Sequence, residues 1–423
     1  MLFIAFACEP GRGSEMGVGW AAVRGAATHR PVHVICHEES RPGFEKYLFN
    51  PTEKHYPITA TFVSIPKLAW LWKSPLTVNI YYYLWQLKAA RIARRIIEKD
   101  PTIEAIQHSS FVRYWMPSAG GLVAYQKHLP FIWGPVGGGD SIPWGFKWDV
   151  GYKGMIQDVF RWMIRSIMER DPLVNRTARA ASVLIASTYE TYDRMKKRFD
   201  RQIELMEAVA HPADRWENIP VRVRQPGEPF QFLSVGRMER WRGLHYGIKA
   251  FAQADLPNAI YDLIGDGPAR KDLQKLVKSL GLENRVRFLG DQPYNECVNA
   301  VASCQVLVHP ALRDSIGCVA EALALRKPVI CAKTTSPAMF VDETCGFCIP
   351  PIHPPQLISE ITRAMKRLYE EPDLLERLGQ GGFVRAKQMS REHRTACFEK
   401  LYARIQSSMS PTRDQNINSS HAA

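Results

Sequence analysis

Short apolar runs alternate with longer amphipathic stretches along this 423-residue chain. Short runs rich in β-branched and aromatic side chains are typical of buried strands, and the stretches between them are long enough to form helices. Because strands and helices alternate, we expect parallel sheets covered by helices on both faces, which is the doubly wound α/β class. The chain is too long for one ordinary hydrophobic core, so the pattern predicts two such domains.

The predicted strands form two groups. In the first half they are expected at Leu2–Ala7, Val32–Cys36, Thr61–Ile65, Ile103–Gln107, Phe131–Trp133, Val183–Ala186 and Glu204–Met206. In the second half they are expected at Phe230–Val235, Ile260–Ile264, Val286–Leu289, Val306–Val308 and Val329–Cys331. Helices are expected at Gly243–Gln253, Ala269–Leu280, Cys318–Leu325, Pro355–Glu370, Pro372–Met389 and Arg391–Gln406.

The stretch between the two groups, residues 211–229, is rich in proline and has no helical period, so we interpret it as an interdomain linker. It separates a first domain at residues 1–210 from a second domain at residues 230–390. The helix at residues 391–406 is expected to complete the first domain. The polar residues 407–423 are predicted to be disordered.

Charge and composition limit the classes of function. The formal net charge is +13, which favours an anionic partner such as a nucleic acid, a phosphorylated ligand or a negatively charged membrane surface. No nucleic-acid recognition module accompanies this charge, so we do not expect a nucleic-acid partner. Nine cysteines without a repeated spacing indicate a reducing compartment, and Cys345–Cys348 lacks the second pair that a metal site would need.

The sequence predicts neither a signal peptide nor a membrane-spanning segment. Met1–Cys8 is apolar but lacks the positive charge of a signal peptide, and it resembles a first buried strand. No apolar run approaches the ~20 residues that span a bilayer. We therefore expect a cytoplasmic protein, either soluble or peripheral on the inner leaflet of the cytoplasmic membrane.

Charged residues follow two predicted strands of the second half. Arg237 and Arg242 come after the strand at residues 230–235. Guanidinium groups stay charged and can bind phosphate oxygens through two parallel N–H groups, which suits a diphosphate. Asp314 and Glu321 offer carboxylates that can accept hydrogen bonds from sugar hydroxyls. Glu321 lies in an otherwise apolar helix, where a carboxylate needs a partner.

Other candidates lie at strand ends, where ligands bind in doubly wound sheets. In the second half they are Gly236, Gly265, Gly267, Ser315, Ile316 and Gly317. In the first half they are Gly13, Glu15, Gly17, His108, Gly137 and Gly138. Successive glycines let backbone amides approach an anion, and a helix N-terminus can receive a phosphate. The sequence leaves alternatives open: a plain strand-end turn at the glycines, an acceptor hydroxyl at Glu15, and a structural role for His108.

Several segments, in order, resemble the motifs of the retaining glycosyltransferases of family 4, which have the GT-B fold. SVGRMERWRG (234–243) is similar to the family's V-G-R motif, LIGDGPARKDL (263–273) to its G-x-G-P segment, and EALALRKPVI (321–330) to its E-A-x-A helix and following strand. ACEPGRGSEMGVGW (7–20) and FIWGPVGGG (131–139) resemble a branch of bacterial polysaccharide transferases. The resemblance covers nearly the whole chain.

The resemblance implies roles for these residues. Arg237 and Arg242 would bind the donor diphosphate, with Arg242 in place of the family's usual lysine. Glu321 would hold the donor ribose as the second acid of the E-x7-E motif, and base contacts would fall around Leu289. The first acid departs from the family pattern, because position 313 is arginine and the acid, Asp314, stands one residue closer to Glu321.

The function implied is transfer of a hexose, with retention, from a UDP-, GDP- or ADP-linked sugar to a hydroxyl of a glycan or lipid-linked glycan in cell-surface polysaccharide synthesis. Two Rossmann-like domains would face a central cleft, the first binding the acceptor and the second the donor. No cofactor or metal is expected, because the nucleotide sugar is a substrate and arginines serve the diphosphate. A non-catalytic nucleotide-sugar-binding protein and a GT-B nucleotide-sugar epimerase remain the alternatives.

Two stretches mix aromatic and basic residues, Lys67–Ile96 and Trp144–Arg170. Such mixtures suit an anionic membrane surface, where aromatic rings lie at the level of the headgroups. A buried helix with a cationic solvent face explains the same residues. The sequence leaves both interpretations open for each stretch.

Overall fold

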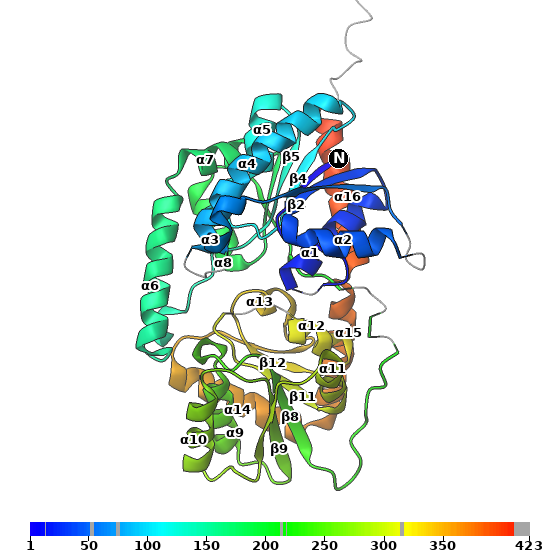
Figure 1. The fold of residues 1–423 in the computed structure, drawn as a ribbon. Coiled ribbons are helices and arrows are strands. Elements are labelled where there is room, and N and C mark those ends of the chain that lie inside the picture. Colours follow the sequence, from blue (N-terminus) through cyan, green and yellow to red (C-terminus); the bar gives the residue numbers. More distant parts are fainter. Residues whose placement is uncertain are drawn as a thin grey trace, which may run out of the picture.

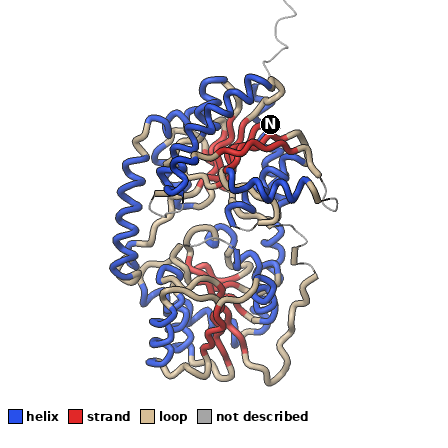
Figure 2. Tube along the Cα trace, in the orientation of Figure 1, coloured by secondary structure: helices blue, strands red, loops and turns tan. Residues whose placement is uncertain are grey.

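The structure is a computed structural model that describes residues 1–12, 14–50, 55–72, 77–211, 215–216, 218–313 and 317–409. It contains two parallel sheets, one above the other in Figure 1, each flanked by helices. Figure 2 shows the strands of each sheet enclosed between helices. The predicted architecture of two doubly wound α/β units is confirmed.

The first sheet has seven strands in the order β3-β2-β1-β4-β5-β6-β7. They are β1 (Leu2–Ala5), β2 (Val32–His37), β3 (Ile58–Val63), β4 (Ile106–Ser110), β5 (Phe131–Val136), β6 (Val183–Ala186) and β7 (Ile203–Leu205). The strand β1 is buried on both faces, as expected of a parallel strand covered by helices on both sides. The chain order reverses between β1 and β4, which makes this pair the topological switch point.

The helices and single 3-10 turns of this half follow the strands. They are α1 (Ser14–Ala27), η1 (Glu38–Ser40), α2 (Arg41–Leu48), η2 (Pro66–Leu68), α3 (Ala69–Trp72), α4 (Val78–Lys99), α5 (Ala119–Lys127), η3 (Trp144–Phe146), α6 (Gly151–Met168), α7 (Pro172–Ala180) and α8 (Tyr189–Arg198). In α4, Tyr81, Tyr82 and Trp85 are buried on one face. The aromatic residues of this part of the first mixed stretch therefore belong to the hydrophobic core.

The second sheet has six strands in the order β10-β9-β8-β11-β12-β13. They are β8 (Phe230–Val235), β9 (Ala259–Ile264), β10 (Val286–Gly290), β11 (Val306–His309), β12 (Val329–Ala332) and β13 (Gly346–Ile349). Its switch point lies between β8 and β11. The strand β13 was not predicted, because its segment GFCI is short and begins with a glycine.

The helices of the second half are α9 (Leu244–Ala254), α10 (Arg270–Ser279), α11 (Tyr294–Ser303), α12 (Gly317–Ala324), α13 (Pro337–Phe340), α14 (Pro354–Glu370), α15 (Pro372–Lys387) and α16 (Arg391–Met409), with the 3-10 turn η4 (Arg240–Arg242) before α9. Among the described residues, no helix has the length and hydropathy needed to cross a bilayer.

In addition to the stretch of chain that joins the two halves, two segments connect them. The helix α16 lies beside the first sheet in Figure 1, where Phe398, Leu401 and Tyr402 pack against residues of β5 and β6. In the other direction, Ile142, Phe146 and Val150 of the first half pack in the hydrophobic core of the second half. Each half therefore contributes side chains to the core of the other.

Candidate active site

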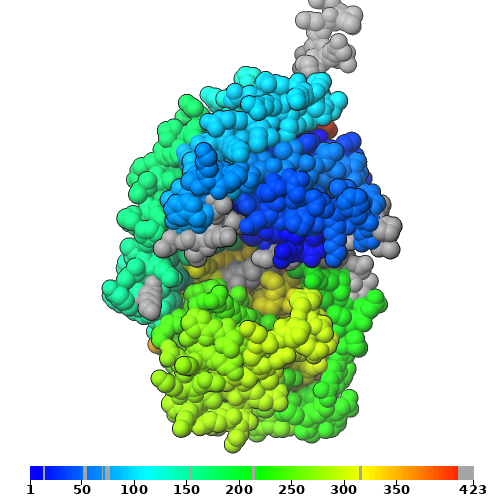
Figure 3. All heavy atoms as spheres, in the orientation of Figure 1, coloured from blue at the N-terminus to red at the C-terminus, as the bar shows by residue number. Residues whose placement is uncertain are grey.

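A cavity of about 330 Å³ lies between the two halves, where Figure 3 shows the surface hollowed. Glu15, Gly137 and Gly138 line it from the first half, and Trp241 and Arg313 line it from the second half. In doubly wound sheets, ligands bind beyond the carboxyl ends of the strands, and both carboxyl edges contribute residues to this cavity.

The upper rim crosses the switch point of the first sheet. Glu15 lies in the first turn of α1, and its carboxylate accepts a hydrogen bond of 3.2 Å from the backbone N–H of Phe111, which follows β4. A Cβ atom at Gly17 would lie 2.5 Å from the carbonyl oxygen of Arg12, so the tight entry into α1 requires glycine there. Gly13, another predicted site residue, lies outside the described residues.

The glycine run after β5 is paired with the neighbouring backbone. The N–H of Gly137 donates to the carbonyl of Val112 at 2.9 Å, and the N–H of Tyr114 donates to the carbonyl of Gly137 at 3.1 Å. The indole N–H of Trp115 donates to the carbonyl of Gly138 at 3.1 Å. Because the N–H of Gly137 is already bonded, the geometry favours the strand-end turn over anion binding at this amide.

His108 lies within β4 and is buried. Its Nε2 is 3.1 Å from the hydroxyl of Tyr82, and burial lowers the pKa of the imidazole to about 3. It is not among the residues that line the cavity between the halves. These observations favour the structural alternative for this histidine.

The lower rim is built at the switch point of the second sheet. Gly236 follows β8 with φ near 140°, and the guanidinium of Arg242 packs so closely against it that a Cβ atom there would lie 2.6 Å from Nη1. Burial, and after it the positive charge of Arg242, lowers the pKa of His309 at the end of β11 to about 3. Arg242 therefore lies at the carboxyl ends of the two central strands.

Arg237 is oriented differently from Arg242. Its side chain is 72% exposed, and its Nε lies 3.2 Å from a carboxylate oxygen of Glu239. A side chain this exposed has room to reorient toward a ligand. Of the two arginines, Arg242 is thus held by its surroundings, whereas Arg237 lies at the surface of the same loop.

The backbones at the carboxyl ends of β8, β9 and β10 lie in close contact. The N–H of Gly265, with φ near 120°, donates to the carbonyl of Gly290 at 2.8 Å. A Cβ atom at Gly265 would lie 2.2 Å from the carbonyl oxygen of Gly236, and one at Gly267 would lie 2.6 Å from that of Met238. These glycines allow the loops after β8 and β9 to touch. Leu289, at the end of β10, is exposed.

Glu321 is 8% exposed within α12. Burial raises its pKa, while a hydrogen bond from Tyr294 and the charge of Arg215 act in the opposite direction. The indole N–H of Trp216 donates to the Tyr294 hydroxyl at 3.3 Å, and the guanidinium of Arg215 lies 4.8 Å from the centre of the Tyr294 ring. The acid thus has partners from α11 and from the predicted linker, which the sequence analysis did not identify.

The loop before α12 carries four predicted residues. Asp314, Ser315 and Ile316 lie outside the described residues. Gly317 begins α12, and among the described residues, its chain neighbours aside, no heavy atom would lie within 4 Å of a Cβ atom there.

Three arginines that sequence reasoning did not single out gather at the cleft. Arg313 lines the cavity described above together with Arg113, and a second cavity together with Arg113 and Arg161. Burial lowers the pKa of Arg113, whose guanidinium donates to the side-chain oxygen of Asn79. Arg313 lies over the Trp241 ring at 5.3 Å. Their convergence makes this part of the cleft cationic.

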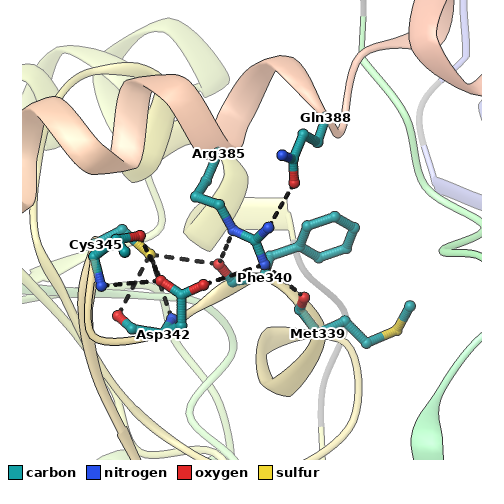
Figure 4. Close-up of polar contacts among 7 residues, drawn as sticks. Met339, Phe340, Asp342, Cys345, Arg385 and Gln388 are labelled. Carbon is teal, nitrogen blue, oxygen red and sulfur yellow. Dashed lines mark hydrogen bonds and ion pairs between the residues drawn. The ribbon is translucent and has the colours of Figure 1, made fainter.

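The segment from Thr335 to Asp342, which includes α13, borders the cavity between the halves through Ser336. The N–H of Thr335 donates to a carboxylate oxygen of Glu190 in α8 at 2.9 Å, which joins the two halves directly. Arg385 of α15 donates to the carbonyls of Phe340 and Met339, each at 3.1 Å, and pairs with Asp342 at 3.5 Å, as Figure 4 shows. The loop from Thr335 to Asp342 is therefore held at both ends.

The described part of the chain contains no group of three or more His, Cys, Asp or Glu side chains that could hold a metal ion. Besides Arg113 and Arg313, the cavity between the halves is lined by the carboxyl side chains of Glu15, Asp140 and Glu207.

The second half of the chain matches a known protein family. Residues 215–385 match the family model described as Glycosyl transferases group 1. The chain is 25% identical over 215 residues to alpha-D-kanosaminyltransferase of Streptomyces kanamyceticus. This match covers 48% of this chain and 55% of that protein. It is 28% identical over 170 residues to the lipopolysaccharide core biosynthesis glycosyltransferase LpsD of Rhizobium meliloti, covering 38% and 45%. The chain thus spans about half the length of the curated relatives it matches.

A solved structure extends the likeness to both halves. HepE of Anabaena in complex with UDP superposes with a TM-score of 0.60 at 17% identity, covering 96% of this chain and 99% of that one. At this identity the likeness concerns the fold. The chain therefore carries a glycosyl transferases group 1 domain at residues 215–385 within a two-sheet GT-B fold.

Proposed function

We propose that this protein is a retaining glycosyltransferase of family 4 that moves a hexose from a nucleotide diphosphate sugar to a hydroxyl group. The acceptor would be a glycan or a lipid-linked glycan of cell-surface polysaccharide synthesis, and the enzyme would work in the cytoplasm or at the inner leaflet of the cytoplasmic membrane. Relatives named for lipopolysaccharide core synthesis and a structural neighbour holding UDP support this substrate class.

One observation carries the proposal. Glu15 lines the cavity between the halves at the switch point of the first sheet, and Arg242 lies at the switch point of the second sheet, one residue after Trp241, which lines the same cavity. Ligands of doubly wound sheets bind at switch points, and a transferase with two substrates needs two such edges facing one space. A binder of one small ligand would need only one of them.

The proposed mechanism assigns the leaving diphosphate to the second half. Arg242 is held at the ends of β8 and β11, and Arg237 is exposed in the same loop, so two guanidinium groups would stabilise the charge that develops on the departing nucleotide diphosphate. The acceptor hydroxyl would attack from the same face of the sugar through an oxocarbenium-like transition state. Glu321 would hold the donor ribose.

The test begins with the donor. Full-length protein is screened by thermal shift against UDP-, GDP- and ADP-sugars, because a ligand at 100 times its dissociation constant stabilises the protein by about 2.7 kcal/mol. Nucleotide release is then followed with the stabilising donor and candidate glycan acceptors, and the anomeric configuration of the product reports retention. We expect Glu321→Ala to lose donor turnover, while Glu283→Ala, at an exposed position of the same half, keeps it.

The outcomes separate the alternatives. A non-catalytic binder would be stabilised by a nucleotide sugar but would release no nucleotide with any acceptor. An epimerase would form a new sugar or sugar nucleotide without an acceptor. Equal turnover by the wild type and Glu321→Ala would remove the assignment of Glu321.

A further inference from the structure

The helix α6 turns its apolar face to solvent. Tyr152, Ile156, Val159, Met163 and Ile167 recur every three or four residues, so they form one stripe along the helix, and all five side chains are exposed. Figures 1 and 3 show α6 at the outer edge of the molecule, away from both sheets. A surface helix of a globular protein normally packs such a stripe against the core.

The side of α6 that faces the protein is mixed, with Ile164 and Met168 packed against the core of the first half and polar side chains beside them. Gln157 and Arg161 line the cavities at the cleft, one of which also includes Arg113 and Arg313. Arg165 is buried, and its guanidinium donates to the carbonyl of Gly139 at 3.3 Å. The helix therefore meets the protein through both apolar and polar side chains and leaves a separate apolar stripe exposed.

Two large aromatic side chains just before the helix are also exposed. Trp144 and Trp148, which precede α6, are 82% and 83% exposed. We call the five residues of the stripe and these two tryptophans the outer face. The ammonium group of Lys147 lies 4.2 Å from the centre of the Trp144 ring. Exposed apolar surfaces of this extent mark interaction sites.

We propose that the outer face docks on an anionic lipid bilayer. A helix of 18 residues is about 27 Å long, and one with an exposed apolar stripe along its length suits the plane of a membrane interface. Tryptophan and tyrosine beside lysine and arginine is the composition of interfacial segments. Residues 144–170 contain five Lys or Arg against three Asp or Glu, and the whole chain carries +13, which complements anionic headgroups.

Docking would bring the cleft next to the lipid. Since one side of α6 meets the bilayer and its other side lines the cationic part of the cleft, an acceptor anchored in the membrane would reach the cavity around this helix. This step rests on the proposed function and deepens it, because it selects a lipid-linked acceptor over a free glycan. The docking itself does not depend on it.

Vesicle flotation tests the docking in the absence of donor and acceptor. The full chain is mixed with vesicles of phosphatidylcholine and phosphatidylglycerol, or of phosphatidylcholine alone, at low and high salt. We expect binding to the anionic vesicles, weakened by salt. Replacement of three outer-face residues, Trp148→Ser, Ile156→Ser and Met163→Ser, should lower partitioning by about tenfold or more, because apolar area inserted in the interface drives such binding.

A matched control uses exposed apolar residues elsewhere. Phe49→Ser and Val384→Ser remove exposed side chains at the end of α2 and in α15, and we expect unchanged partitioning. Hydrogen exchange should show protection of residues 151–168 on vesicles. Thermal shift with a nucleotide sugar checks that the triple variant keeps its fold and donor site.

Three results would overturn the inference. The triple variant could bind anionic vesicles as the wild type does, or the control variant could lose binding equally. In the third result, neither protein binds vesicles, and without lipid the wild type is dimeric while the triple variant is monomeric. That result would assign the outer face to a second copy of the chain. Failure of docking would leave nucleotide release with a soluble acceptor intact, so it is distinguishable from failure of the proposed function.

Discussion

Glu321 is a buried carboxyl whose ionisation opposes folding. Burial raises its pKa above the unfolded value of about 4.3, so the folded state binds the proton more tightly than the unfolded state. The contribution to stability is full below the unfolded pKa and is lost as pH rises through the folded pKa. We therefore expect Glu321→Gln, which keeps an acceptor for Tyr294 and removes the charge, to be more stable than the wild type at neutral pH.

Thermal denaturation at two pH values measures this effect. A gain on the order of 1 kcal/mol would raise Tm by about 2–4 °C at pH 7, and the two proteins should converge below about pH 4, where the carboxyl of Glu321 becomes protonated in the unfolded state as well. Donor turnover should fall in the same variant, because an amide holds a ribose hydroxyl less strongly than a carboxylate. Glu283→Gln is the control. A Tm at pH 7 below that of the wild type would contradict the expectation.

For single residues, the sequence was most informative where the position of a residue follows from the strand directly before it in the chain. Gly236 and Arg242 could be assigned to the carboxyl end of β8 because the apolar run before them is clear. Tyr294 and Arg215 could not be assigned to Glu321, since their proximity depends on how α11 and the segment after His211 fold onto α12. Arg113, Arg161 and Arg313 converge for the same reason, through the packing of the halves.

Among the elements, α16 supplies a testable contribution to the first half. Leu401 is buried in a cluster with Ile132, Val183 and Ile185 of β5 and β6. Leu401→Ala should lower the free energy of unfolding by about 2–5 kcal/mol, since truncation removes buried methyl groups and leaves a cavity. Urea denaturation measures the loss. Lys400→Ala, at an exposed neighbouring position, should stay within about 0.5 kcal/mol of the wild type. Equal stability of both variants would mean that α16 only rests on the sheet.

The helices and strands also show what sequence periodicity can predict and what it cannot. All twelve predicted strands overlap observed ones, two of them with identical bounds, because parallel strands buried on both faces read as continuous apolar runs. The helices α4 and α6 have similar mixtures of aromatic and basic residues, yet α4 buries its aromatic face and α6 exposes its apolar stripe. Periodicity identifies a stripe, but the direction it faces depends on what the rest of the chain offers it.

For the whole molecule, the segment around η3 couples the two halves. Phe146 comes from the first half in sequence but is fully buried in the core of the second, where the centres of its ring and the Tyr246 ring lie 5.5 Å apart at an interplanar angle of 83°. The Tyr246 hydroxyl donates to a carboxylate oxygen of Asp149 at 2.9 Å. The halves can therefore separate only if this segment leaves the second core.

We expect Phe146→Ala to weaken this coupling. The truncation should cost about 3–5 kcal/mol, most of it in the second half, whose core loses the ring. Denaturation of the wild type should follow one transition, whereas the variant should show two, with the second half unfolding first and a bound nucleotide sugar shifting only that transition. Trp144→Ala, at the exposed neighbour, should keep the single transition. A single transition at lower denaturant in Phe146→Ala would instead assign the coupling to α16 and the Glu190–Thr335 contact, which also join the two halves.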